Sequence, residues 1–285
     1  MWMLFAFLSA IFAALTSIFA KIAIKYVDSK LATALRTEVV LAMAWLMVLI
    51  TGSFDGIRAI SGHTLLFLIL SGLATGASWL CYFRAISLGD VNKVAPIDKS
   101  STVLTMILAF ILLGEGFTPI AGMGMVLMFI GTMLMIERKD IERRAGKPSW
   151  IVYAVLSAVF AALTSILGKI GIEGVDSNLG TAIRTCVVLV MAWMIVFMQG
   201  TWRQTKDIGK RNCGFLILSG LATGASWLCF YRALQEGPAS LVVPIDKLSI
   251  LFTVLFAAII LREGMSSRSW SGLALLVIGT LMLLL

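Results

Sequence analysis

The sequence predicts an all-α polytopic membrane protein whose ten transmembrane helices form two inverted five-helix repeats. Of its 285 residues, 60% are hydrophobic and only 13% are charged, whereas soluble proteins are about 25% charged. Residues 67–81 recur unchanged at 215–229, an offset of 148 residues that marks a duplication. Each copy divides into five apolar segments, and because five is odd the second copy enters the membrane in the opposite direction.

The apolar segments can be placed in order, since a spanning helix needs about 20 mainly apolar residues. In the first copy they cover 2–24, 31–51, 65–87, 92–113 and 118–136. In the second copy they cover 150–172, 179–199, 213–235, 240–261 and 268–285. The first segment matches 150–172, which favours a retained helix over a cleaved signal peptide. The chain therefore divides into a first repeat (1–137), a basic connector (138–148) and a second repeat (149–285).

Basic residues differ between the copies in the way that opposite topologies require. The net charge is +8, and lysine and arginine mark cytoplasmic loops. Lys25 of the first copy becomes Glu173 in the second, whereas Asp55 becomes Arg203. This alternation predicts a multi-pass protein of the cytoplasmic (inner) membrane, with cytoplasmic loops after every odd-numbered segment and both termini outside. The basic residues are thus interpreted as topology signals, and we expect no nucleic-acid partner.

Residues that commonly hold metals or cofactors are sparse. The single histidine is His63, and the cysteines show no metal-ligand spacing: Cys81, Cys186, Cys213 and Cys229. No phosphate-binding loop occurs in the sequence. We expect no metal, no cofactor and no use of ATP by this chain.

Several motifs occur in both copies. Pro-Ile-Asp-Lys opens the fourth and ninth segments at 96–99 and 244–247, and Glu115 and Glu263 follow near the ends of those segments. With the repeated Ser-Gly-Leu-Ala-Thr-Gly-Ala-Ser-Trp-Leu-Cys run, they resemble the EamA family of the drug/metabolite transporter superfamily. The resemblance covers essentially the whole chain. It implies two EamA repeats that act on a small-molecule substrate in a lipid bilayer.

That family moves amino acids, other metabolites, organic cations and drugs, so the resemblance leaves the substrate open. The two similar copies also resemble a fusion of half-length five-helix units that pair as dimers. A homodimer is therefore one expectation for the assembly.

Glycines repeat at one spacing in the third segment of each copy: Gly72, Gly76, Gly220 and Gly224. Small residues let helices approach closely. Two interpretations stay open, ordinary tight packing, or room for a central cavity and for sliding between segments 65–87 and 213–235.

Aromatic residues follow those glycines. Trp79 and Trp227 either line a substrate pocket or anchor the helix at the membrane interface. Tyr82 and Tyr231 lie closer to the segment ends, and we expect them to be interface anchors.

Ionisable residues inside the apolar segments are costly to bury and usually pair or face a cavity. They recur in both copies: Lys21, Arg36, Arg84, Asp98 and Lys99, with the equivalents Lys169, Arg184, Arg232, Asp246 and Lys247. The two sets lie near opposite membrane faces, which predicts two charged vestibules rather than one central charged site. Long basic side chains near segment ends can reach the interface.

An aspartate side chain is too short to reach the interface, so each aspartate needs a partner. We expect pairs within each half: Asp98 with Arg36 or Lys21, and Asp246 with Arg184 or Lys169. Such pairs are either alternating gates or structural contacts. The prolines at 96 and 244 favour a local helix break beside each aspartate.

Glutamates differ in how they repeat. Glu38 is replaced by Cys186 in the second copy, and it is either a proton carrier or a structural partner of Arg36. Glu115 and Glu263 occur in both copies, and we interpret them as helix-end caps rather than substrate ligands.

Together these features predict a secondary active transporter of a small organic solute that works by alternating access and is driven by a proton or exchange gradient. Intramembrane basic residues outnumber acidic ones, which favours a carboxylate or zwitterion such as an amino acid. The alternatives are a flippase for a lipid-linked carrier, a channel and a membrane-embedded enzyme. An enzyme would need a metal cluster, an acid and base pair, or a nucleophile, so no enzymatic activity is expected.

Overall fold

The two halves are built from equivalent helices. The structure, a computed structural model, describes residues 1–24, 27–88, 94, 97–135, 149–256, 259 and 266–284. The first half contains α1 (Trp2–Ile24), α2 (Ser29–Ile50), η1 (a 3-10 helix, Ser53–Ala59), α3 (Gly62–Leu88), α5 (Ser101–Leu112) and α6 (Pro119–Leu134). The second half contains α7 (Ser149–Ile172), α8 (Ser177–Met198), η3 (a 3-10 helix, Thr201–Asp207), α9 (Lys210–Glu236), α10 (Ala239–Lys247), α11 (Ser249–Phe256) and α12 (Ser267–Met282). The predicted connector at 138–148, Pro96 and Glu263 lie outside the described residues.

Equivalent residues begin and end equivalent helices. The side chain of Asp28 accepts hydrogen bonds from the first backbone N–H groups of α2, and Asp176 does the same for α8, as an aspartate at an N-cap does. Both helices are followed by a glycine at positive φ, Gly52 at 68° and Gly200 at 70°, a conformation that favours glycine. The duplication therefore fixes local structure in both halves.

Among the residues that the structure describes, seven stretches are long and apolar enough to span a membrane: α1, α2, α3, α7, α8, α9 and the pair α10 and α11. The helices α6 and α12 have 16 residues each and α5 has 12, below the ~20 that a spanning helix needs. The structure therefore supports a polytopic helical membrane protein, while ten spans stay a prediction.

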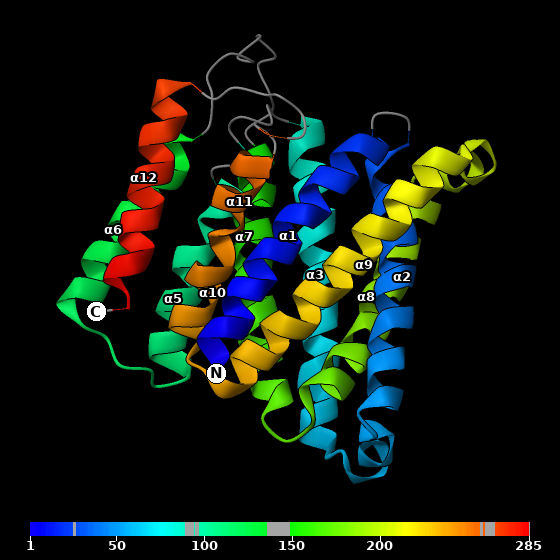
Figure 1. Ribbon diagram of the computed structural model, residues 1–285, viewed down its shortest axis with the longest axis horizontal. Helices are drawn as coiled ribbons and strands as arrows, with labels where there is room; N and C mark the ends of the chain where they lie inside the picture. The colour runs from blue at the N-terminus through cyan, green and yellow to red at the C-terminus, as the bar shows by residue number, and fades with distance from the viewer. Residues whose placement is uncertain are drawn as a thin grey trace.

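The halves pack through matched helix pairs (Figure 1). Helix α1 lies against α9, α3 against α7, α2 against α8, and α6 against α12. The pair α6 and α12 stands at one end of the molecule and the pair α2 and α8 at the other. Backbones meet closely in the first of these pairs, since a β-carbon added at Gly124 would lie 2.7 Å from the Gly279 carbonyl oxygen, and one at Gly131 would lie 2.6 Å from that of Gly272. The order of these contacts shows that α6 and α12 are antiparallel.

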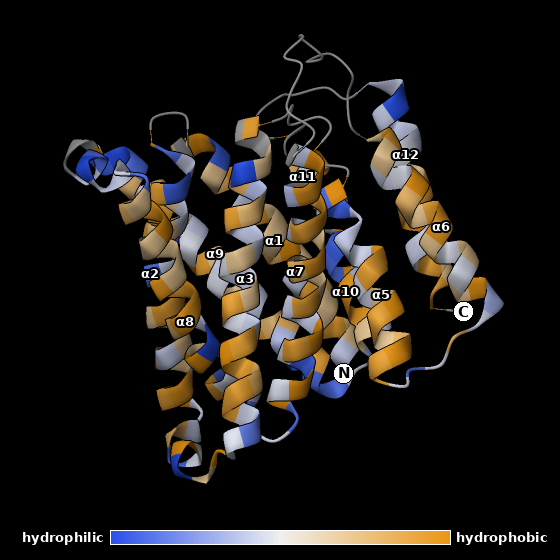
Figure 2. Cartoon of the chain, turned by 180° about the vertical axis from the view of Figure 1, so that it is seen from behind, coloured by the Kyte–Doolittle hydropathy of each residue, from blue (hydrophilic) through white to orange (hydrophobic). Residues whose placement is uncertain are grey.

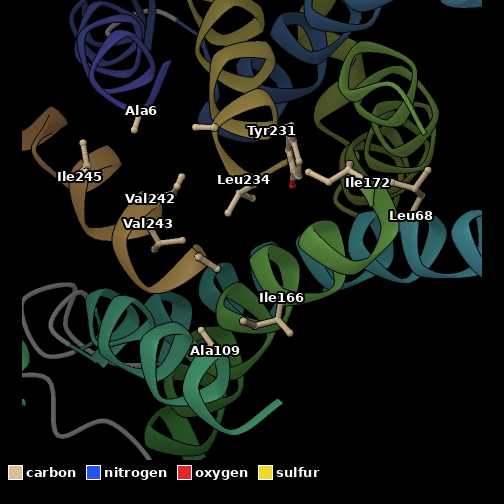
Figure 3. Close-up of a cluster of buried hydrophobic side chains, with 12 residues drawn as sticks. Ala6, Leu68, Ala109, Ile166, Ile172, Tyr231, Leu234, Val242, Val243 and Ile245 are labelled. Atoms are coloured by element: carbon tan, nitrogen blue, oxygen red, sulfur yellow. The ribbon is translucent and has the colours of Figure 1, made fainter. Parts of the chain in front are cut away.

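Hydrophobic residues make up most of the length of the helices, and hydrophilic residues gather toward their ends (Figure 2). Inside, the largest buried cluster joins α9 and α10 to α7 and α3 (Figure 3). Its members include Tyr231 and Leu234 of α9, Val242 of α10, and Ile166 and Ile172 of α7. The cluster packs the two halves together near the carboxyl ends of α7 and α9.

Candidate functional site

A cavity of about 310 Å³ lies between the two halves. Ala13, Thr75 and Ala161 line it from the middle of α1, α3 and α7. The rest of the lining is mainly polar or aromatic: Ser78, Trp79, Thr164, Ser165, Arg184, Ser226, Trp227, Phe230, Tyr231, Asp246 and Lys247. Five predicted site residues, the two tryptophans, Arg184, Asp246 and Lys247, therefore meet in one cavity.

The charged residues of this cavity, Arg184, Asp246 and Lys247, all come from the second half, and two charged vestibules stay a prediction. Asp246 lies seven residues into α10, so the helix places it about 10 Å from its start. Pro244 is inside α10, and the helix ends at Lys247 before α11 begins at Ser249. The predicted break beside the second aspartate is thus observed.

Arg184 is the most enclosed charged residue of the cavity, with 2% of its surface exposed. Its Nε donates to Ser71 Oγ (3.2 Å) and its Nη2 donates to Thr75 Oγ1 (2.6 Å). Its guanidinium carbon lies 4.7 Å from the ring centre of Tyr231 and 5.2 Å from that of Trp227, within range of cation–π attraction. All of these partners are uncharged, so the expected pair between Arg184 and Asp246 does not form in this conformation.

The aspartates instead accept hydrogen bonds from serines across the interface between the halves. Ser9 Oγ donates to Asp246 Oδ1 (2.6 Å), and the equivalent Ser157 Oγ donates to Asp98 Oδ1 (2.7 Å). Lys247 Nζ also lies 3.6 Å from Asp246 Oδ2. Within the described part of the chain, no ion pair joins Asp98 to Arg36 or Lys21, or Asp246 to Arg184 or Lys169.

Hydroxyl groups connect α1 to α9 and α3 to α7 in matched positions. Ser9 and Ser226 share a hydrogen bond of 3.2 Å, and Ser78 and Ser157 share one of 3.4 Å. Thr16 and Thr223 are 3.2 Å apart at Oγ1, and Thr75 and Thr164 are 3.3 Å apart. Sequence analysis missed these residues because a serine or threonine on a small-residue face carries no signal of its partner.

The tryptophans and tyrosines have different surroundings from those expected of interface anchors. Trp79 and Trp227 line the cavity, which favours the first of their two proposed roles. Tyr231 is 2% exposed and packs beside Arg184 in the core, so its assignment as an anchor was wrong. Tyr82 is partly buried against the cluster of Ala85 and Ala154.

The four repeated glycines lie at close helix contacts, which favours the first of their two interpretations. A β-carbon added at Gly72 would lie 2.7 Å from Val187 Cβ, and one at Gly76 would lie 2.5 Å from Met191 Cβ. The equivalents Gly220 and Gly224 meet Val39 and Met43 in the same way. Helix α3 thus packs on α8 and α9 packs on α2.

Further polar contacts lie beyond Arg184, toward the carboxyl ends of α7 and α9. Lys169 Nζ donates to the carbonyl oxygens of Leu234 and Gly237. Glu115 accepts from the backbone N–H groups of Ala239 (2.6 Å) and Ser240 (2.8 Å), the first residues of α10. Glu115 is therefore a helix cap as predicted, but for a helix of the opposite half.

The equivalent charges of the first half lie outside this cavity. Arg36 has a buried Nε without a hydrogen-bond partner in the part of the chain that the structure describes. Lys99 meets Lys247 at a small pocket between α5, α6, α11 and α12. Lys21 has an exposed side chain near the end of α1.

Glu38 also lies away from the cavity, on the exposed side of α2. Its Oε1 accepts a hydrogen bond from Trp193 Nε1 of α8 (2.9 Å). Glu38 is therefore hydrogen-bonded to Trp193 rather than to Arg36, the partner considered from the sequence.

Among the described residues, no group of three or more His, Cys, Asp or Glu side chains is placed to hold a metal ion. The chemistry available to the cavity is ion pairing, hydrogen bonding and aromatic stacking.

These features define a polytopic helical membrane protein with a polar cavity between two similar halves. The model of the EamA-like transporter family matches residues 1–137 and 148–285. The chain therefore belongs to the EamA-like transporter family, as its motifs implied.

Individual relatives carry transporter names. A Sinorhizobium sp protein named "Uncharacterized transporter in cobO 3'region" is 44% identical over 135 residues, which are 47% of this chain and 96% of that protein. An "Uncharacterized transporter" of Archaeoglobus fulgidus is 22% identical over 86% of this chain and 84% of its own length. One solved crystal structure has a TM-score of 0.80 at 17% identity and covers 99% of this chain and 95% of its own. At that identity, the likeness to the solved structure concerns the fold alone.

Proposed function

We propose that this protein is a secondary active transporter of small organic solutes, with its substrate site in the central cavity. The observation that carries this proposal is the cavity's position: both halves line it, and three helices reach it at their midpoints. Transporters built from inverted repeats bind substrates near the bilayer midplane, between the repeats. A volume of about 310 Å³ suits a small metabolite.

The matched contacts between the halves support an inverted arrangement of the repeats. Ser9 meets Ser226, and each equivalent residue, Ser157 and Ser78, meets the other. A two-fold axis between two copies produces this reciprocity. The antiparallel crossing of α6 and α12 supports such an axis in the plane of the membrane.

The two halves differ in the way that alternating access requires. Near the carboxyl ends of α7 and α9, Arg184 and Glu115 form hydrogen bonds across the interface between the halves, and Lys169 joins α7 to the end of α9 within the second half. In the opposite conformation, the equivalent Arg36 would form such contacts at the other membrane face. We propose that both termini lie outside the cell. We also propose that a proton gradient or solute exchange drives transport.

The charges of the cavity favour a solute with a carboxylate. Arg184 and Lys247 are basic, and Asp246 is the acidic residue of the lining. Asp246 is already close to Lys247, whereas Arg184 has uncharged partners. A carboxylate or a zwitterion with an apolar part would complement Arg184 and the two tryptophans.

The test is transport by purified protein in liposomes. Solute-evoked currents and pH changes are measured with panels of amino acids, organic acids and organic cations. We expect a response to carboxylate-bearing solutes that is lost in Trp227→Ala and strongly reduced in Asp98→Asn and Asp246→Asn. Arg232→Gln is the matched control, because Arg232 pairs with Glu236 on the outside of α9 and should transport normally.

Two outcomes would count against the proposal. Silence across the whole panel with folded protein would favour the flippase of a lipid-linked carrier. Fluxes far above the turnover of carriers would favour a channel.

A further inference from the structure

A second pocket, of about 270 Å³, lies between α2, η3 and α9 and shares no lining residue with the central cavity. We call it the lateral pocket. Its walls include Leu35, Val39 and Leu216, its polar groups include Glu38 and Thr205, and Cys213 lies at its edge. Glu38 is in the middle third of α2 and Cys213 is in the first turn of α9, so the pocket extends from near the membrane surface into the hydrocarbon depth.

Glu38 is exposed on a helix that is long and apolar enough to span the membrane. A carboxylate at that depth needs a partner, because hydrocarbon solvates a charge poorly. In the part of the chain that the structure describes, Glu38 forms no ion pair, and its recorded donor is Trp193 Nε1. One neutral N–H leaves most of the acceptor capacity of a carboxylate unused.

The repeat shows that the pocket is not required by the fold. At the equivalent place in the other half, Cys186 replaces Glu38, Ile57 replaces Thr205 and Leu65 replaces Cys213. There, Ile57 and Ile183 pack against a buried cluster that includes Leu179. The same backbone can therefore fill this space with aliphatic side chains, and in one half it holds an acid instead.

The chemistry of the lateral pocket points to a cation. Glu38 is the charged residue of the pocket lining, and a carboxylate offers an ammonium group an ion pair with charge-assisted hydrogen bonds. The aliphatic walls suit an apolar tail. We propose that the lateral pocket binds an ammonium amphiphile from the membrane, with its cationic group at Glu38 and its apolar part along Leu35, Val39 and Leu216.

Cys213 provides a direct reporter. The protein with Cys81→Ala, Cys186→Ala and Cys229→Ala retains Cys213 as its sole thiol, and it is placed in nanodiscs of zwitterionic lipid. The rate of maleimide alkylation is measured with octylammonium or octanoate, which have equal chain lengths and opposite charges. We expect octylammonium to slow alkylation about fivefold or more, and octanoate to slow it less than about twofold.

Variants of Glu38 test the role of its charge. Glu38→Gln should abolish protection by octylammonium, and Glu38→Asp should retain part of it. The matched control combines Leu65→Cys with Cys213→Ala, which moves the thiol to the equivalent place in the other half, where octylammonium should give no protection.

Three results would overturn the proposal: no protection of Cys213 by octylammonium, equal protection by octanoate, or protection that survives Glu38→Gln. If Glu38→Gln does not fold, the comparison of the two amphiphiles on the parent protein still decides. These outcomes do not depend on transport through the central cavity.

Discussion

Arg184 and Arg36 occupy equivalent positions in the two halves, yet their surroundings differ. Arg184 donates to Ser71 and Thr75, whereas Arg36 Nε is buried and has no hydrogen-bond partner among the described residues. The hydroxyl groups equivalent to the acceptors of Arg184 are present beside Arg36, on Ser219 and Thr223. Ser219 and Thr223 make the same backbone hydrogen bonds as Ser71 and Thr75, to the facing helix and to the preceding turn.

The difference therefore arises largely from conformation, because the helix segments that supply the acceptors have the same sequence. One amino-acid run, at 67–81 and at 215–229, supports an engaged arginine in one place and a disengaged one in the other. One sequence difference adds to this asymmetry, since Tyr231 lies over Arg184 and its equivalent is Phe83. Elements that are stable in two arrangements are what a transporter needs to alternate between states.

The largest effect should come from removing the engaged arginine. Arg184→Ala loses two charge-assisted hydrogen bonds, so we expect a loss of about 2–4 kcal/mol in the free energy of unfolding and no measurable transport. Arg36→Ala should change stability by less than about 1 kcal/mol, because its Nε makes no hydrogen bond to lose. Thermal unfolding in detergent and liposome uptake measure the two effects. Equal destabilisation by both variants would remove the contrast between the halves.

The glycines should show a smaller asymmetry. A β-carbon at Gly76 would lie 2.5 Å from Met191 Cβ, close to the backbone, whereas one at Gly224 would meet the flexible Met43 Sδ at 2.8 Å. Gly76→Ala should therefore destabilise by about 1–3 kcal/mol and Gly224→Ala by less than about 1 kcal/mol. Paired thermal melts check the difference.

Transport provides an independent check of the same contact. Gly76→Leu should abolish transport while expression is retained, since α3 and α8 could no longer approach. Normal uptake by that variant would show that the close contact is dispensable.

Glu115 tests the contact that holds α10. Glu115→Gln removes the negative charge facing the first N–H groups of α10, and we expect a loss of about 1 kcal/mol. Hydrogen exchange should accelerate at Ala239 and Ser240. The control is Glu236→Gln, on the exposed pair with Arg232, and it should leave those two amides unchanged; acceleration in both variants would point to a general loosening.

The smallest effect should come from exchanging the aromatic residues beside the arginines. Tyr231→Phe removes the phenol oxygen but keeps the ring over Arg184, so we expect a loss of less than about 1 kcal/mol. Phe83→Tyr on the other side should have an effect of similar size. Melting temperatures measure both, and a large loss in Tyr231→Phe would mean that the hydroxyl, rather than the ring, holds Arg184.

Patterns within one segment were predictable from the sequence, and contacts between segments mostly were not. A helix break near Asp246 was predicted from Pro244, and close packing at Gly72 and Gly76 was predicted from their spacing. The helix that packs against these glycines was not predictable, because small residues indicate a close approach without indicating which helix approaches.

Depth and direction explain the remaining errors at the site. Tyr231 lies five residues before the end of its helix, a position typical of an interface anchor, yet it turns inward toward Arg184. Asp246 was expected to need a basic partner, and a serine of the opposite half shares that role. Both outcomes depend on how the halves face each other, which periodicity within a segment does not encode.

The short helices α6 and α12 have a consequence for the surrounding lipid. Each has 16 residues and is bounded by described cap residues, so each is about 24 Å long, against a hydrocarbon thickness of about 30 Å. At the other side of the bundle, α9 has 27 residues and is about 40 Å long. The bilayer is expected to thin beside α6 and α12, and this hydrophobic mismatch gives the protein a thin edge and a thick edge. Membrane thickness should then influence how the molecule tilts and which neighbours gather at its thin edge.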